Sequence, residues 1–236
     1  MVRSDLTWKI GIMTTPEAAI TRSTTAVSLP LLLTRLRQTY PGARCQLHYQ
    51  TPIQLLVATI LSSQCTNELV NQVTPLLFAR FPTAVDLATA NRLELTSIIR
   101  PTGFSRQKAR YIQEAARIIV KDYDGEVPND MAALVRLPGV ARRTANMVLG
   151  EIYQAAAGIT VDTHVTRLTQ RLGLSQATDP GKVEQTLMTF VPRELWIEVS
   201  RLLVFHSHRH CHARSPECLA CPLNDVCPSA EVPLEG

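Results

Sequence analysis

Long apolar runs are missing from this 236-residue sequence. No stretch of about 18 consecutive apolar residues occurs, and the first thirteen residues offer only the segment 10–13 as an apolar stretch. A transmembrane helix and a secretory signal are therefore not expected. We expect a cytoplasmic protein without membrane contact, in which the six cysteines are reduced or bound to metal.

Glycine is also scarce, with 10 residues, whereas hydrophobic residues make up 45% of the chain and charged residues 19%. These proportions exclude collagen-like and disordered chains. They leave a globular protein that is long enough for one large domain or two smaller ones.

The excess of positive charge is small overall but concentrated in one segment. The net charge is +4, and residues 100–121 alone hold six bases and one acid, a local charge of +5, so the rest of the chain sums to −1. The bases are Arg100, Arg106, Lys108, Arg110, Arg117 and Lys121. Such a cluster is typical of surfaces that neutralise phosphates, although a solvated helix face gives the same pattern.

The spacing of apolar residues predicts an all-α fold, because intervals of three and four dominate and alternating runs are almost absent. Thr51 and Ser105 are predicted N-caps, and Pro75 predicts a bend. Residues 1–26 show no clear period and are left as an arm of uncertain order. Helices are predicted over 27–40, 52–63, 66–81, 83–88, 92–99, 105–123, 129–136, 142–157, 163–171, 181–190 and 192–206.

Four cysteines, Cys211, Cys218, Cys221 and Cys227, follow the spacing C-x6-C-x2-C-x5-C. Four thiolates so close in sequence satisfy either a tetrahedral zinc ion or the corners of a [4Fe-4S] cluster, and the spacing alone leaves both open. The neighbouring histidines His206, His208, His210 and His212 fit no common zinc pattern, so we expect them to be surface or DNA-facing residues. Cys45 and Cys65 are isolated and are expected to be packing residues.

Two further segments carry candidate chemistry. The segment 137–146 reads LPGVARRTAN, a glycine-bearing hairpin followed by the start of a helix, where free backbone N–H groups can dock a phosphate without reading a base. Asp162 follows an apolar run and opens the next helix, where a carboxylate can act as a simple cap, activate a water molecule or stabilise a developing cation. A plain interhelical turn remains the alternative for the hairpin.

Taken together, these segments resemble the endonuclease III family of DNA glycosylases, which carry a helix-hairpin-helix motif. The motifs in family order are LSSQCTN at 61–67, TGFSRQKA at 102–109, DGEVP at 124–128, LPGVARRTAN, VDTH at 161–164 and the cysteine spacing. The resemblance covers about residues 28–228. It implies two helical domains with a cleft between them, a [4Fe-4S] cluster on the four cysteines, and a partner in double-stranded DNA with damaged or abasic sites.

The resemblance also implies domain boundaries and residue roles. We expect residues 45–155 to form a six-helix domain, and residues 1–44 to join 156–236 in the cluster domain of a monomer that is nucleoid-associated if bacterial. Gln64 would fill the gap left by a flipped-out base, and Phe104 would wedge between bases. Asp162 and Arg143 are the expected catalytic residues. Further DNA contacts are expected from Arg106, Lys108, Gly139, Ala141, Arg142, Thr144, His164 and Arg214.

The sequence departs from the family at the hairpin. Members that also cleave the strand carry a lysine there, whose amine attacks the sugar and forms a Schiff base, and the aligned residue here is Arg143. A guanidinium stays protonated and cannot form that Schiff base. The four lysines of the chain all lie outside the hairpin, and Ala141 in place of a second hairpin glycine is expected to strain the turn.

Three hypotheses follow. The first is a base excision repair glycosylase that acts on damaged, oxidised pyrimidines, with its AP-lyase activity, the cleavage of the strand at an abasic site, weak or lost. The second is a non-catalytic binder of damaged or abasic DNA that keeps the fold and the cluster. The third is a zinc-stabilised helical DNA-binding module.

Overall fold

The computed structural model describes residues 26–230, and within that range every regular element is a helix. Most of the expected N-terminal arm, residues 1–25, lies outside the described residues. No helix in the described range is long and apolar enough to span a membrane. The elements are α1 (Leu29–Thr39), α2 (Pro52–Leu61), α3 (Asn67–Arg80), α4 (Ala84–Thr89), α5 (Arg92–Ile98), η1 (Arg100–Thr102), α6 (Ser105–Asp122), α7 (Met131–Leu134), α8 (Arg142–Tyr153), α9 (Thr163–Arg171), α10 (Pro180–Phe190), η2 (Arg193–Leu195) and α11 (Trp196–Arg209).

Local signals placed most helix ends correctly. The Thr51 side chain accepts a hydrogen bond from the backbone N–H of Gln54 (3.4 Å), as expected of the cap of α2. The expected cap at Ser105 is wrong, because Phe104 precedes α6 in a left-handed conformation (φ +48°) and Ser105 is already helical. Helix α8 ends at Tyr153 rather than at residue 157, since the next residue turns left-handed (φ +51°) and stops it.

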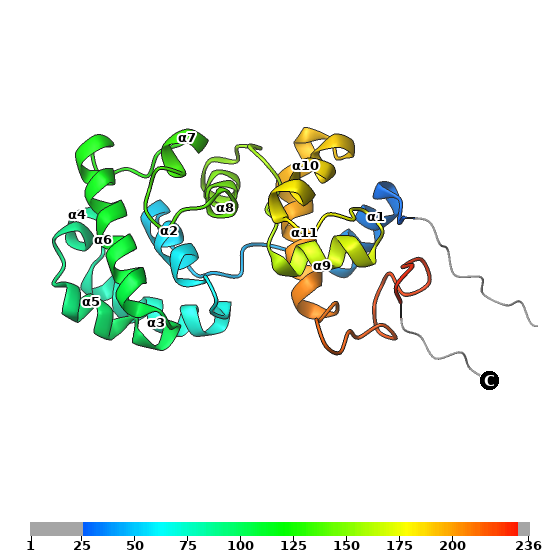
Figure 1. Cartoon of the computed structure of the whole chain (residues 1–236), viewed down its shortest axis with the longest axis horizontal. Coiled ribbons are helices and arrows are strands. Elements are labelled where there is room, and N and C mark those ends of the chain that lie inside the picture. The colour runs from blue at the N-terminus through cyan, green and yellow to red at the C-terminus, as the bar shows by residue number, and fades with distance from the viewer. Residues whose placement is uncertain (1–25, 231–236) are drawn as a thin grey trace, which may run out of the picture.

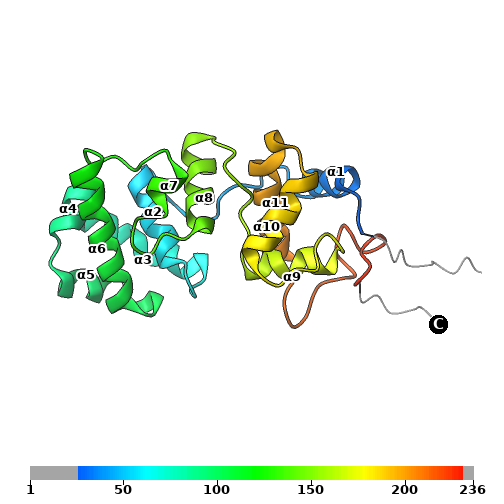
Figure 2. The same cartoon turned by 45° about the horizontal axis from the view of Figure 1, so that its top comes forward.

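Two separate hydrophobic cores divide the chain into two domains. The first core draws its buried residues from 47–149 and unites α2–α8, and the second draws them from 27–40 and 159–223 and unites α1 with α9–α11. Both views show α1 lying against α11 in the second domain, far in sequence but close in space (Figures 1 and 2). The expected all-α fold of two domains is confirmed, while the boundaries 1–44, 45–155 and 156–236 stay a prediction.

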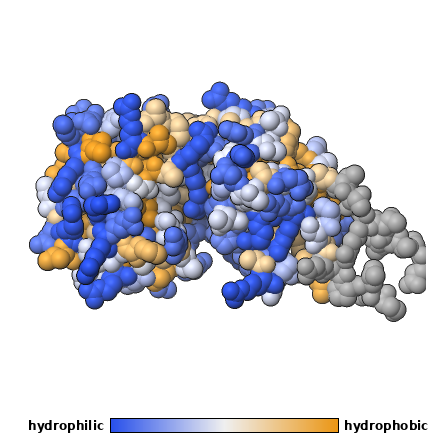
Figure 3. All heavy atoms as spheres, in the orientation of Figure 1, coloured by the Kyte–Doolittle hydropathy of each residue, from blue (hydrophilic) through white to orange (hydrophobic). Residues whose placement is uncertain are grey.

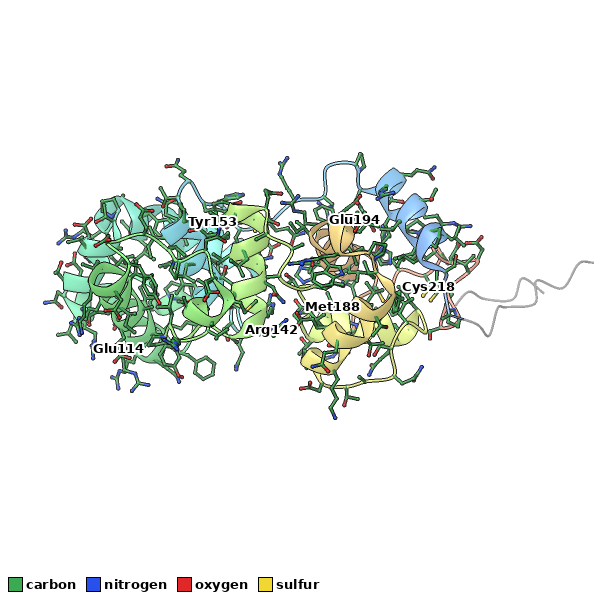
Figure 4. The ribbon with its side chains drawn as sticks, turned by 90° about the horizontal axis from the view of Figure 1, so that it is seen from above. Glu114, Arg142, Tyr153, Met188, Glu194 and Cys218 are labelled. Atoms are coloured by element: carbon green, nitrogen blue, oxygen red, sulfur yellow. The ribbon has the colours of Figure 1, made fainter. Side chains whose placement is uncertain are left out.

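Helix α8 connects the two domains through its polar side chains. Glu184 on α10 accepts hydrogen bonds from Arg142 Nε (2.7 Å) and from Asn146 Nδ2 (2.8 Å), although only 5% of its side chain is exposed. At the other end of α8, Glu151 pairs with both nitrogens of the Arg201 fork on α11 (2.8 and 3.0 Å). These contacts fix both ends of α8 against the second domain, and Figure 4 shows Arg142 at this junction.

Candidate active site

A cleft of about 920 Å³ lies between the two domains, and Figure 3 shows the surface hollowed there. The first domain contributes the loop after α2, the start of α3 and the start of α8, and the second contributes the starts of α9 and α10 and the end of α11. Six of the predicted site residues line it: Gln64, Ala141, Arg142, Arg143, Asp162 and His164. The cleft therefore unites predicted site residues that are up to 100 positions apart in the sequence.

The hairpin before α8 depends on Gly139 and leaves the start of α8 uncapped. Gly139 adopts φ +79°, and a Cβ atom there would lie 2.9 Å from the Tyr111 ring of α6, so both backbone conformation and space require glycine. The expected strain at Ala141 is wrong, since its backbone is extended (φ −88°). Ala141 offers no side-chain cap, which leaves the first N–H groups of α8 unsatisfied at the cleft.

Asp162 and Arg143 face each other in the cleft. Asp162 is buried (8% exposed), and its Oδ1 accepts a hydrogen bond from the backbone N–H of Val165 (2.8 Å), so it is the N-cap of α9. Its Oδ2 lies 3.4 Å from Arg143 Nη2. The cap therefore holds the carboxylate rigidly, with the guanidinium of the second expected catalytic residue beside it.

The histidines are less exposed than expected. His206 is buried, where desolvation lowers its pKa to about 4, and its Nδ1 lies 2.9 Å from the Tyr40 hydroxyl. His208 lines the cleft, with its ring edge-on to His164 at 4.8 Å between centroids. The expectation of surface or DNA-facing histidines is therefore wrong for His206, because its ring packs in the core of the second domain. His212 and His164 do line the cleft.

The two residues expected to enter the duplex share an unusual backbone. Gln64 and Phe104 have φ of +53° and +48°, a left-handed conformation that residues other than glycine rarely adopt. Phe104 is 63% exposed, which excludes the alternative that it folds onto the core. It lies outside the cleft lining, beside Gly103 at the start of α6. The roles of both residues in DNA stay predictions.

The remaining expected DNA contacts separate into exposed and structural residues. Arg106 and Arg214 are exposed and free to meet a phosphate. Lys108 is only 4% exposed, and its ammonium donates to the carbonyls of Leu61 (2.8 Å) and Thr102 (2.7 Å). Its expected DNA contact is therefore wrong, because those two carbonyl groups hold the ammonium inside the first domain. Thr144 is also buried, at 7% exposed.

The four cysteines of the motif line one cavity of about 30 Å³ in the second domain. Arg171 on α9 holds the first of them, since its Nη1 lies 3.3 Å from Cys211 Sγ and donates to the His212 carbonyl (2.7 Å). Burial raises the pKa of Cys221 to about 11. At Cys221 a positively charged metal group would therefore favour the thiolate. Cys45 and Cys65, by contrast, both pack against the first core, as expected.

Comparison with known proteins agrees with this architecture. Residues 57–193 match the HhH-GPD superfamily of base excision DNA repair proteins, and residues 211–227 match the iron-sulfur binding domain of endonuclease III. Endonuclease III of Synechocystis sp. is 54% identical over 200 residues, which cover 85% of this chain and 91% of that protein. The chain belongs to the endonuclease III family.

Solved structures of endonuclease III superpose on the same range. A non-covalent endonuclease III–DNA complex has a TM-score of 0.82 at 40% identity, and a trapped endonuclease III–DNA covalent intermediate has a TM-score of 0.81 at 39% identity. Each alignment covers 86% of this chain and 95% of the other. As a member of the endonuclease III family, the chain is a DNA N-glycosylase of base excision repair that binds damaged DNA and carries an iron-sulfur cluster. The zinc hypothesis is wrong.

Sequence reasoning missed two residues of the site, Asn146 and Glu184, which join α8 to α10 under the cleft. His208, expected to be a surface or DNA-facing residue, forms part of the cleft wall. Asn146 lies three positions after Arg143, on the same face of α8. That spacing was a usable signal, whereas Glu184 belongs to another helix, and no local pattern marks it.

Proposed function

We propose that this chain is a monofunctional DNA N-glycosylase that removes oxidised pyrimidines from duplex DNA by attack of water, with its AP-lyase activity weak or lost. The observation that carries the proposal is the Arg143–Asp162 pair in the cleft, 3.4 Å between Nη2 and Oδ2. A guanidinium offers no free amine to the sugar. Hydrolysis requires no amine, because water attacks a cation-like sugar that the Asp162 carboxylate stabilises.

The surrounding residues have matching roles in this proposal. The free N–H groups at the start of α8 and the hairpin hold a phosphate of the damaged strand. Gln64 fills the gap left by the extruded base, Phe104 wedges between the remaining bases, and Arg106 and Arg214 neutralise phosphates. The protein acts as a monomer in the cytoplasm, in association with the nucleoid.

The iron-sulfur cluster is proposed to be of the [4Fe-4S] type, held by Cys211, Cys218, Cys221 and Cys227. The four thiols line one cavity, while no three His, Cys, Asp or Glu side chains of residues 26–230 are spaced to hold a single ion. When bound, such a cluster supplies a rigid cross-link of the loop. Purified protein is expected to be brown and to contain about four iron and four sulfide per chain.

A non-catalytic binder of damaged or abasic DNA remains the second candidate. It is favoured by one observation: both oxygens of Asp162 already have partners, the Val165 N–H and Arg143 Nη2. Asp162→Asn tests the two candidates, because asparagine keeps the cap of α9 but loses the negative charge. In a single-turnover assay we expect base release to fall by about 10²-fold or more, with unchanged affinity for abasic duplex. If neither the wild-type protein nor the variant releases a base while both bind abasic duplex, the binder is supported.

A further inference from the structure

The buried side chain of Lys108 joins two segments that are far apart in the sequence. Its ammonium donates to the carbonyl of Leu61 (2.8 Å), the last residue of α2, and to the carbonyl of Thr102 (2.7 Å) in η1. Gln64 follows the first carbonyl by three residues, and Phe104 follows the second by two. One nitrogen atom therefore links the Gln64 segment (residues 61–66) to the Phe104 segment (residues 102–104).

The carbonyl of Leu61 is open to the ammonium because α2 ends there. In a longer helix this carbonyl would accept from the N–H of Cys65, but that N–H donates to the Ser62 carbonyl instead (3.2 Å). A cation at the carboxyl end of a helix is also favourable to the helix dipole. Lys108 thus fixes the point at which the Gln64 segment leaves α2.

The Phe104 segment is held on both sides of its turn by the same residue. The Lys108 ammonium binds the Thr102 carbonyl, while the Lys108 backbone N–H donates to the Phe104 carbonyl (3.0 Å). Between these two bonds the chain turns through Gly103 (φ +72°) and Phe104 (φ +48°). A left-handed residue other than glycine persists only where its surroundings hold it, so these bonds help to fix the direction of the Phe104 side chain.

The hydrogen-bonded connection between the two segments runs through Lys108. Within residues 26–230, no hydrogen bond passes directly from the Gln64 segment to the Phe104 segment, and no residue other than Lys108 bonds to both. Bonds from an ammonium are stronger than those between neutral groups. With 4% of Lys108 exposed, water competes little for them.

We propose that Lys108 is a positioning residue whose ammonium couples the Gln64 segment to the Phe104 segment, so that the two side chains enter the duplex as one rigid unit. This inference rests on the proposed function, in which Gln64 fills the gap left by the extruded base and Phe104 wedges between the remaining bases. Side chains that are already held in their bound arrangement lose less entropy when they enter DNA. In this role Lys108 contacts neither the DNA nor the reacting atoms.

The test is a double-mutant cycle of Gln64→Ala and Phe104→Ala. Single-turnover base release from a duplex with one oxidised pyrimidine and the affinity for abasic duplex are measured for both single variants and the double variant. With Lys108 present, we expect the double variant to lose about tenfold less than the product of the two single losses. In a Lys108→Met background, which keeps the length of the side chain but removes the donor, the losses should multiply to within about twofold.

Gln113→Met is the matched control background. Gln113 lies on the same helix, is 3% exposed, and donates from Nε2 to the carbonyl of Ala90 (2.7 Å), which belongs to neither segment. This change also removes a buried donor from a backbone carbonyl, so it destabilises the first domain without touching the link between the segments. We expect the tenfold coupling between Gln64 and Phe104 to persist in it.

The outcomes separate this inference from the proposed function. Losses that multiply with Lys108 present, or a coupling that stays tenfold in Lys108→Met, overturn the inference and leave the proposed function intact. A wild-type protein that binds abasic duplex but releases no base overturns the proposed function, while the affinity cycle still tests Lys108. If Lys108→Met does not fold, a crystal structure of the wild-type protein on abasic duplex decides: an ammonium bonded to both carbonyls, with Gln64 and Phe104 in the duplex, supports the inference, and one detached from either carbonyl overturns it.

Discussion

In the proposed mechanism, Arg143 determines which nucleophile the cleft can offer. Its guanidinium is half-buried beside Asp162 and stays protonated at any physiological pH. The charge at this position is thus the one that a lysine would bring, while the ability to form a covalent bond to the sugar is lost. The proposed function therefore separates recognition of DNA from covalent chemistry at a single residue.

Arg143→Lys is expected to restore covalent chemistry. The amine would enter the cleft beside the Asp162 carboxylate, where burial and the start of α8 favour loss of its proton. Borohydride treatment should then trap a protein–DNA complex that the wild-type protein does not form, and a denaturing gel measures it. A trapped complex with the wild-type protein, or none with a variant that still releases base, would contradict this role of Arg143.

At the scale of elements, the hairpin and α6 form one unit. The Tyr111 ring packs directly beneath Gly139, and Gln107 Nε2 donates to its hydroxyl (2.7 Å). The packing fixes the hairpin relative to the start of α6, where Phe104 and Arg106 lie. The hairpin is in this way held in a fixed position relative to the exposed residues at the start of the basic segment.

Gly139→Ala should disturb this unit. The new Cβ would meet Tyr111 at 2.9 Å in a backbone of φ +79°, so we expect a loss of about 1–3 kcal/mol of stability and weaker DNA binding. Denaturant unfolding and a binding titration measure the two effects. Gly42→Ala is the matched control, because nothing lies within 4 Å of its added Cβ. Equal effects at both glycines would show that the packing beneath Gly139 does not matter.

Sequence reasoning reached most of the elements but only part of the site. Caps and apolar spacing placed α2 and α9 to within two residues, because these signals act within one helical turn. Lys108 was misjudged because its charge suggested a phosphate, whereas its partners are carbonyls 47 and 6 positions away. The contact of His208 with Gln46 was not foreseen for the same reason, since Gln46 lies 162 positions before it. Contacts between distant segments leave no local pattern.

In the whole molecule, the cleft depends on how α8 is held between the domains. The buried Glu184 of α10 holds the first part of this helix through Asn146, and Arg201 of α11 holds its last part through Glu151. Arg143 and Asn146 project from the same helix. The relative position of Arg143 and Asp162, which come from different domains, therefore depends on these interdomain bonds.

Glu184→Ala is expected to cost about 1–3 kcal/mol, since Asn146 Nδ2 loses its shorter hydrogen bond and Arg142 its partner. Base release should slow as well, because the start of α8 is no longer fixed. Glu94→Ala breaks an ion pair with Arg80 in which both side chains are over one-third exposed, so it should change the free energy of unfolding very little. Thermal or denaturant unfolding compares the stability of the two variants. A smaller loss of stability for Glu184→Ala than for Glu94→Ala would refute the claim that Glu184 holds α8 in place.

The central claim is hydrolysis of the glycosidic bond without a covalent enzyme–DNA intermediate. The most direct measurement is a single-turnover reaction on duplex DNA that carries one oxidised pyrimidine, with each sample split and developed with or without hot alkali. The account predicts strand breaks only after alkali, because base release leaves an intact abasic site. Breaks of equal amount without alkali would contradict it and would show that another nucleophile has taken the place of the family lysine.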